Sequence, residues 1–357
     1  MIYLNVAGLF PFNQAVQQEV ANTLEQFSRL LYSEEGIYYY RETMQRCRKN
    51  VAQWLHVANP ESVAFAPNAT TASWLVLSRI HWQSEDHILT TTHENSTVLK
   101  EILGLQTQGV QVHTLDPTSP TELENEIEHY LASQQVRAIV ISHVSHIDGR
   151  IFPIERIAKL AHAHDAFLIV DGAQAVGHIP INFERWQPYA YFFPGHKWCA
   201  GPMGTGALIL GERFMERDAL GRDKKQEHWQ PLWADFELGT QNIGLIAGLA
   251  KACLIKQEDG LKTNRLEQIR EEIQQNLSKI SQFKILEWDG PHSPGILSFT
   301  FLDKQTESQL QSKSDDMTWK TFSLPKNPSQ TGIRLSWSSD ITKTEVEYFF
   351  NLLQSSL

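Results

Sequence analysis

A short apolar run that ends in a carboxylate constrains the fold of this chain more than any other feature. Residues 166–170 read AFLIV, and Asp171 follows at once, before Gly172, Ala173 and Gln174. This pattern predicts a buried strand whose functional end is its C-terminal edge, because open α/β sheets bind ligands at that edge. We therefore expect an α/β fold built around a mainly parallel sheet.

A second apolar run, residues 189–193, leads to His196 and Lys197. Two strands that end near Asp171 and Lys197 would place an acid and an amine at the same sheet edge. A lysine amine forms a Schiff base with an aldehyde cofactor, and a carboxylate keeps a pyridine nitrogen protonated so that the ring accepts electrons from a carbanion. From spacing alone, a helix-capping Asp171 and an exposed loop Lys197 are equally acceptable.

The segments VDGAQAVGHIPINF and FFPGHKWCAGPMGTGAL resemble the cofactor signature of the class V aminotransferase family. This family of pyridoxal phosphate enzymes includes cysteine desulfurases, selenocysteine lyases and cysteine C–S lyases, and the resemblance continues in order over nearly the whole chain. It implies the fold-type I PLP-dependent transferase fold. We expect a large mainly parallel-sheet cofactor domain at residues 13–255, and a small α+β domain from residues 1–12 and 256–357. It also implies pyridoxal 5'-phosphate as cofactor, anchored on Lys197, with Asp171 at its ring nitrogen.

Composition excludes several other classes of function. The 357 residues suffice for a large and a small domain, and the net charge of -10 argues against partners such as nucleic acid or an acidic membrane. The N-terminal MIYLNVAGLFPF lacks a basic segment and a long apolar run, so we expect a cytoplasmic protein. The three cysteines show neither a disulfide framework nor metal-ligand spacing, and we expect no metal.

A phosphate site is predicted where residues 63–66, an expected strand, meet a helix that begins near Ala69. Small and hydroxyl side chains at a helix N-terminus suit an anion, although Thr70 could equally be an N-cap. The resemblance aligns Ala69, Thr70 and Thr71 with the family's phosphate loop, and it implies that His196 also binds phosphate. Pro194 replaces a family Ser or Thr, which removes a hydrogen bond worth on the order of 1 kcal/mol.

Three further side chains are expected around the cofactor ring. The resemblance implies that His93 stacks on the ring and relays protons, although Thr92 replaces the acid that usually precedes it. Gln174 matches a residue that contacts the phenolic oxygen of the cofactor. His146 stands where the family's SHVSN segment has an asparagine that binds the same oxygen.

The resemblance also assigns residues to the substrate and to a second subunit. Arg334, in GIRLSW, is expected to bind the substrate carboxylate through two hydrogen bonds, and Asn5 to approach the substrate. Thr240, in FELGTQN, resembles a threonine that reaches the phosphate of the other subunit, which implies a homodimer. Residues 213–233 are expected to form a loop whose Trp229 and Trp233 either close over a substrate or pack against a partner chain.

The cysteine positions decide which reaction we favour. A desulfurase needs a mobile cysteine in its small domain, but there is none after Cys253, and residues 322–331 contain none. We therefore expect a C–S β-lyase acting on cysteine, cystine, a cysteine conjugate or a sulfoxide, in which Lys197 takes the α-proton. The alternatives are an aminotransferase or epimerase of an amino acid, a cysteine desulfurase or selenocysteine lyase-type enzyme, and a non-catalytic cofactor-binding module.

Overall fold

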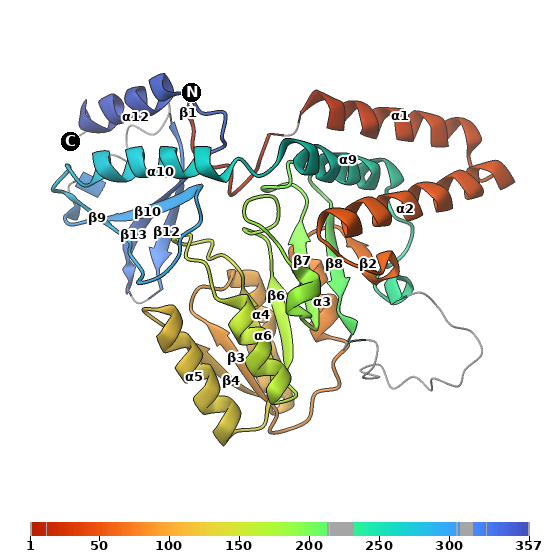
Figure 1. The fold of residues 1–357 in the computed structure, drawn as a ribbon, viewed down its shortest axis with the longest axis horizontal. Helices are drawn as coiled ribbons and strands as arrows, with labels where there is room; N and C mark the ends of the chain where they lie inside the picture. The colour runs from red at the N-terminus through yellow and green to blue at the C-terminus, as the bar shows by residue number, and fades with distance from the viewer. Residues whose placement is uncertain are drawn as a thin grey trace.

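The large sheet has seven strands in the order β2-β8-β7-β6-β5-β3-β4 (Figure 1). The structure, a computed structural model, describes residues 2–11, 13–212, 214, 232–304, 306–307, 317–325 and 327–355. In the large sheet β8 is antiparallel to its two neighbours, and the other pairings are parallel. The strands are β2 Val63–Ala66, β3 His87–Thr91, β4 Gln111–Leu115, β5 Val136–Ser142, β6 Phe167–Asp171, β7 Ala190–Pro194 and β8 Gly206–Leu210.

Continuous apolar sequence explains why the central strands lie inside the sheet. Every residue of β6, β7 and β8 is buried, as expected for strands that are covered on both faces. Alternate side chains of β6 enter two separate cores: Leu168 and Val170 join one, whereas Phe167 and Ile169 join the other. Asp171 ends this strand, so the core holds it in a fixed place.

Helices cover the large sheet and extend beyond it on one side. The bundle of α1, α2 and α9 lies beside β2 and β8 in Figure 1, and α9 packs against both other helices. The α-helices are α1 Gln14–Leu30, α2 Glu34–Trp54, α3 Ala69–Leu77, α4 Ser96–Gly104, α5 Pro120–Ser133, α6 Ile154–Ala163, α7 Phe183–Trp186, α9 Ile243–Asp259, α10 Thr263–Leu277 and α12 Lys343–Ser355. Short 3-10 turns cover Pro60–Ser62, Leu105–Gln108 and Leu232–Asp235.

A smaller antiparallel sheet, ordered β12-β13-β10-β9, forms the other end of the molecule. Its strands are β9 Phe283–Ile285, β10 Ile296–Phe301, β12 Lys320–Leu324 and β13 Asn327–Ser336, while β1 Ile2–Tyr3 pairs with β11 Met317–Thr318. Leu297 and Phe299 pack with residues of α10 and α12. The opposite face meets the large domain, where the Ser298 hydroxyl donates to the Ile147 carbonyl.

These observations confirm the predicted fold class, with its large mainly parallel sheet and its small sheet domain. The strands of the large sheet fall within residues 63–210 and those of the small sheet within residues 283–336. The domain boundaries that we expect, 13–255 against 1–12 with 256–357, stay a prediction. Within the described ranges, no helix combines the length and apolar character needed to cross a membrane.

Candidate active site

Asp171 and Lys197 lie at the same edge of the large sheet. Strands β6 and β7 are parallel neighbours, with Asp171 opposite Phe192, and Lys197 follows β7 by three residues. Burial raises the pKa of Asp171, while the charge of Lys197 opposes this shift. Burial also lowers the pKa of Lys197, and Asp171 opposes that shift in turn. The acid and the amine are therefore within electrostatic range of each other.

A glycine lets the chain turn immediately after Asp171. The Oδ1 atom of Asp171 accepts a hydrogen bond of 2.8 Å from the Ala173 backbone N–H. A Cβ atom on Gly172 would lie 2.1 Å from the ring of Tyr191, so only glycine fits here. Backbone and neighbouring ring together fix the direction of the carboxylate.

Arg334 comes from the small domain and lies buried against the large one. Its Nη1 atom donates to the His146 carbonyl at 2.7 Å, and its Nη2 atom donates to Oδ1 of Asn5 at 3.1 Å. Burial lowers its pKa to about 10, and its charge also lowers the pKa of Lys197. The two residues predicted to bind substrate, Asn5 and Arg334, thus contact each other beside Lys197.

His93 lies between two carboxylates at the end of β3. Its Nδ1 atom is 3.1 Å from the Ser145 hydroxyl and 3.9 Å from Oδ1 of Asp148. Its Nε2 atom is 3.9 Å from Oδ1 of Asp116. The sequence lacks the acid that usually precedes this histidine, and these neighbours take its place. Groups from other loops therefore orient the imidazole.

The other two predicted imidazoles keep a buried nitrogen without a hydrogen-bond partner. Nδ1 of His146 and Nδ1 of His196 have none among the described residues, and neither has Nε of Arg334. Burial, followed by the charges of Arg334 and Lys197, lowers the pKa of His146 to about 3. Burial and then Lys197 lower the pKa of His196. Both rings are therefore poised as neutral hydrogen-bonding groups.

The predicted phosphate residues form the first turn of α3. Asn68 caps this helix, and its Oδ1 atom accepts from the Thr71 N–H at 2.7 Å. The Thr70 hydroxyl is 3.0 Å from that of Thr97. The capping side chain therefore occupies one of the N–H groups that a phosphate could bind, while the N–H groups of Ala69 and Thr70 lie outside the helical ladder.

Gln174 has protein partners at both ends of its amide. Its Oε1 atom accepts from the Trp198 indole at 2.6 Å, and its Nε2 atom donates to the Ala7 carbonyl at 3.1 Å. Only its second N–H is left for the cofactor oxygen that we expect it to bind. The tryptophan that forms this bridge comes directly after Lys197 in the sequence.

Thr240 lies in an exposed loop, and Glu237 anchors the chain just before it. The Glu237 carboxylate pairs with Arg48 and accepts from the Phe65 backbone N–H at 2.7 Å. Gly239 follows with φ of 70°, and Thr240 is exposed. A threonine held outward suits the prediction that it serves a second subunit, which stays a prediction.

The structure describes one of the two loop tryptophans. Trp229 lies outside the described residues. The indole of Trp233 donates to Oε2 of Glu61 at 2.7 Å, and the Arg48 guanidinium lies 4.1 Å from its ring centre. These partners hold Trp233 within its own chain, and its contact with a substrate or with a partner chain stays a prediction.

Sequence reasoning missed Glu94. Its carboxylate is buried and accepts from the Thr91 hydroxyl at 2.6 Å and from the Ser142 hydroxyl at 2.7 Å. Burial, and to a lesser degree the charge of Asp171, raises its pKa to about 8. In the sequence this acid comes directly after His93, whereas the family resemblance points to an acid directly before it.

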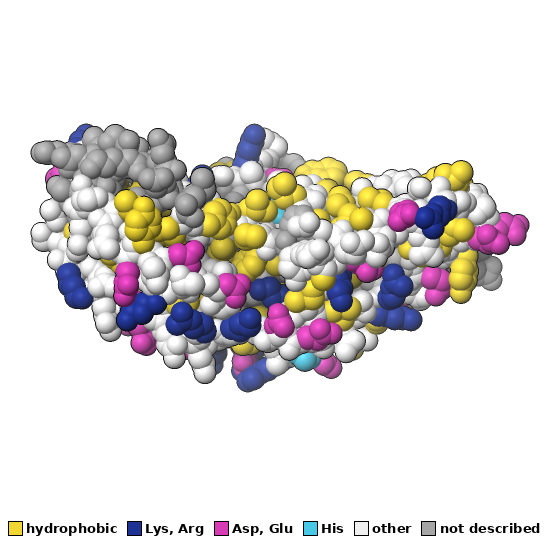
Figure 2. Space-filling view, turned by 90° about the horizontal axis from the view of Figure 1, so that it is seen from above, with side chains coloured by type: hydrophobic (Ala, Val, Ile, Leu, Met, Phe, Trp, Pro, Cys, Tyr) yellow, Lys and Arg dark blue, Asp and Glu magenta, His cyan; other side chains and the backbone are white. Residues whose placement is uncertain are grey.

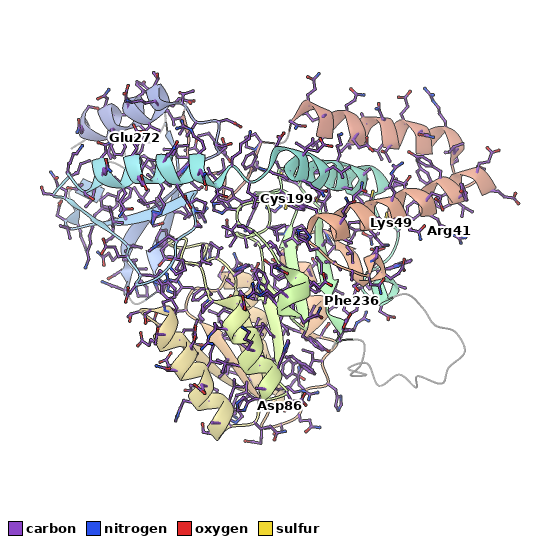
Figure 3. All side chains as sticks on the ribbon, viewed as in Figure 1. Arg41, Lys49, Asp86, Cys199, Phe236 and Glu272 are labelled. Atoms are coloured by element: carbon purple, nitrogen blue, oxygen red, sulfur yellow. The ribbon has the colours of Figure 1, made fainter. Side chains whose placement is uncertain are left out.

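The three cysteines, Cys47, Cys199 and Cys253, are all buried. Cys199 lies near the middle of the molecule (Figure 3), and its thiol approaches the Val176 carbonyl at 3.5 Å. Burial raises the pKa of Cys47 and of Cys199 to about 12. Residues 322–325 and 327–331 lie in the β12–β13 hairpin, whose register shifts between Ser323 and Leu324. This hairpin is the segment in which we expect a desulfurase to carry its cysteine.

The residues present fit pyridoxal phosphate. Unpaired buried polar atoms cost free energy, so those of His146, His196 and Arg334 indicate groups that a ligand completes. Asp171 would hold the ring nitrogen, while the first turn of α3 and His196 would hold the phosphate. Fold and site together therefore define a fold-type I pyridoxal phosphate enzyme.

Comparison with known proteins assigns the family. Residues 10–314 match the family described as Aminotransferase class-V, and the chain belongs to that family. The predicted family and its pyridoxal phosphate cofactor are thereby confirmed.

Sequence identity to individual relatives is low, but the alignments cover most of the chain. The chain is 25% identical to the cysteine desulfurase IscS of Vesicomyosocius okutanii over 321 residues, covering 88% of this chain and 78% of that one. It is 26% identical to the cysteine desulfurase of Homo sapiens over 323 residues, with coverage of 88% and 69%. Among solved structures, a complex of the cystine C–S lyase C-DES with cysteine persulfide has a TM-score of 0.85 at 20% identity, covering 98% of this chain and 96% of that chain.

Proposed function

We propose that the protein is a pyridoxal phosphate-dependent C–S β-lyase that acts on cysteine, cystine or a related cysteine conjugate. One observation carries this proposal: Asp171, Lys197 and Arg334 converge, while every cysteine is buried and the β12–β13 hairpin carries none. The kinship with cysteine desulfurases and the fold shared with a cystine C–S lyase support sulfur chemistry.

Each residue has a defined task in this reaction. Bound pyridoxal phosphate supplies an electron sink for the negative charge that develops at the substrate α-carbon. Asp171 keeps the proton on the ring nitrogen, and Lys197 takes the α-proton on Nζ, which its lowered pKa favours. Arg334 binds the substrate carboxylate with its planar fork of N–H groups.

The β-elimination balances without an oxidant or reductant. A cysteine whose sulfur carries a group R, together with water, gives pyruvate, ammonia and the thiol RSH. A disulfide substrate gives the corresponding persulfide, because the carbon–sulfur bond breaks and the sulfur–sulfur bond is kept. The electron pair of the broken bond leaves with sulfur, which then takes up a proton.

We also propose a homodimer in which Thr240 completes the phosphate site of the other subunit. Figure 2 looks onto the face formed by α1, α9, α10 and α12 and shows hydrophobic side chains exposed over its middle. The apolar surface of α1, α2 and the Thr240 loop consists of Leu24, Leu31, Tyr32, Ile37, Tyr38 and Leu238, all exposed. Such a surface suits contact with a second copy. A cytoplasmic location stays a prediction.

The deciding experiment is product analysis with L-cysteine and L-cystine, without reductant, on the cofactor-loaded protein. We expect pyruvate with sulfide from cysteine, and pyruvate with cysteine persulfide from cystine, and no product from Lys197→Ala. Alanine as product would instead establish a desulfurase, the second candidate, which the curated relatives favour. Transfer of the amino group to an added keto acid would establish an aminotransferase.

A further inference from the structure

A cavity of about 460 Å³ lies between the two domains. The small domain contributes Lys284 and Ile285 of β9, the two residues that follow β9, and four residues of the β12–β13 hairpin, Leu324, Pro325, Asn327 and Gln330. The large domain contributes the loops after β4 and β5, and His93. Its charged lining residues are Asp116, Asp148, Arg150, Lys284 and Glu287.

This cavity begins where the candidate active site ends. His93 belongs to both, since it lines the cavity and stands among the residues predicted to surround the cofactor. Ile147 and Asp148 line the cavity directly after His146, whose carbonyl binds Arg334. A substituent on the sulfur of a substrate held by Arg334 therefore has room to extend into it.

The charged side chains on the large-domain wall of the cavity already have partners within the chain. Nη2 of Arg150 is 2.7 Å from Oδ2 of Asp148, and its Nη1 atom donates to the Pro117 carbonyl at 2.8 Å. Both side chains of this ion pair are buried, so it is a fixed neutral element of the wall. Asp116 accepts from the Thr92 hydroxyl at 2.8 Å.

The small-domain wall offers two opposite charges without such partners. Lys284 and Glu287 are exposed, and neither forms an ion pair or side-chain hydrogen bond with another part of the chain that the structure describes. Lys284 alternates with the core residue Phe283 and pairs with Thr300, so it lies on the sheet face that meets the large domain. A cation and an anion thus border the same cavity, three residues apart in the sequence.

We propose that this cavity is the leaving-group subsite and that it selects sulfur substituents carrying both an ammonium and a carboxylate group. Lys284 attracts the carboxylate, and Glu287 attracts the ammonium. This inference rests on the proposed C–S lyase function and adds its substrate class. An uncharged substituent gains no electrostatic binding energy from Lys284 or Glu287. The difference in affinity between charged and uncharged substituents is the expected selectivity.

The test uses four disulfides of L-cysteine that differ in the charge of the second thiol. These thiols are 2-mercaptoethanol, 3-mercaptopropionate, cysteamine and L-cysteine itself, and kcat/KM is measured as pyruvate release. We expect Lys284→Gln to lower kcat/KM about three- to fivefold for the two disulfides whose leaving group carries a carboxylate, as for an exposed ion pair. We expect Glu287→Gln to do so for the two that carry an ammonium. Both effects should shrink in 1 M salt.

Matched controls remove the same charges elsewhere in the small domain. Lys279 is exposed beyond α10, and Glu272 lies on α10, on the helix-covered side of the small sheet (Figure 3). Lys279→Gln and Glu272→Gln should leave all four values unchanged. If Lys284→Gln and Glu287→Gln change the four substrates equally, or change none, the subsite assignment is wrong.

A binding measurement separates failure of the subsite from failure of the proposed function. Calorimetry on Lys197→Ala protein reports the affinity for L-cystine and for the 2-mercaptoethanol disulfide without turnover. We expect added Lys284→Gln to weaken L-cystine binding three- to fivefold and to leave the neutral disulfide unaffected. Equal weakening of both overturns the subsite, whereas selective weakening without any pyruvate from the wild type overturns only the lyase function.

Discussion

Glu94 is a buried acid whose proton should govern the pH dependence of stability. Its pKa is 4.5 as a reference value and about 8 in the fold, so the folded state keeps a proton that the unfolded state loses. The unfolded state therefore binds fewer protons between these values, and stability falls as pH rises from about 4.5 to about 8. A shift of this size corresponds to a free energy on the order of 5 kcal/mol.

We expect Glu94→Gln to remove this fall. Thr91 and Ser142 donate to different oxygens of Glu94, so the amide oxygen of the variant can accept from one hydroxyl while the amide nitrogen donates to the other. Urea unfolding of the cofactor-free protein at pH 5 and at pH 8 gives the change in the free energy of unfolding between these pH values. The wild type should lose more stability over this range than the variant, and Asp171, present in both, cancels in the comparison. Parallel losses in the two proteins would contradict the assignment.

Arg334 allows a prediction about substrate binding. Arg334→Lys keeps a positive charge but cannot reproduce both the planar fork and the bonds to His146 and Asn5. We expect KM for L-cysteine or L-cystine to rise at least tenfold, since a hydrogen bond to a charged group is worth about 2 kcal/mol. Steady-state pyruvate release measures it, with the exposed Arg185→Lys as control. An unchanged KM would remove Arg334 from substrate binding.

The sequence was more informative about strand ends than about side-chain partners. Asp171 and Lys197 could be placed together because parallel strands bring their C-terminal ends to one edge. Glu94 and the bridge from Gln174 to Trp198 could not, because their partners come from other strands and segments. Which hydroxyl binds the Glu94 carboxylate, and which indole binds the Gln174 amide, depends on how the segments pack in the fold. No local sequence pattern encodes this packing.

The loop that carries Thr240 depends on one buried ion pair between elements. Arg48 of α2 and Glu237 are both nearly inaccessible, and Arg48 also donates to the Val63 carbonyl at 2.8 Å. Removing one partner leaves a buried charge, which costs about 3 to 5 kcal/mol. We expect Arg48→Met to destabilise the protein by this amount, measured by chemical unfolding.

A double variant tests the physical reason for that loss. Arg48→Met with Glu237→Gln removes both charges, so it should recover part of the stability lost in Arg48→Met. Glu237→Gln also keeps an amide oxygen that can accept from the Phe65 N–H. If the double variant is less stable than Arg48→Met, packing rather than the stranded charge explains the loss.

At the scale of elements, the apolar runs at residues 166–170 and 189–193 predicted the central strands β6 and β7, but no strand was predicted at residues 206–210, where β8 lies. An apolar run also does not show in which direction its strand runs. β8 has the same continuous burial as β6, yet it runs antiparallel to its neighbours. The short segment after β7 makes this possible, because antiparallel neighbours need no long crossover. The β12–β13 hairpin was foreseen only as a segment lacking cysteine, since its residues 322–331 combine few apolar side chains with two prolines.

At the scale of the whole molecule, the exposed apolar surface predicts association. We expect Leu31→Asp with Leu238→Asp to convert a dimer to a monomer, because each change places a charge in a contact that excludes water. Sedimentation velocity over a range of concentrations measures it, with Leu103→Asp on α4 as control. A monomeric wild type, or a dimeric double variant, would contradict the proposed assembly.

The bond from Arg334 to Asn5 joins residues 329 positions apart in the chain. During synthesis, the first of these residues leaves the ribosome long before the second exists. The strand that ends in Asp171 and the strand that Lys197 follows can pair earlier, because they lie within the first two thirds of the sequence. The nascent chain can therefore bring together the residues predicted to hold the cofactor before Arg334, which is predicted to bind the substrate, has been made.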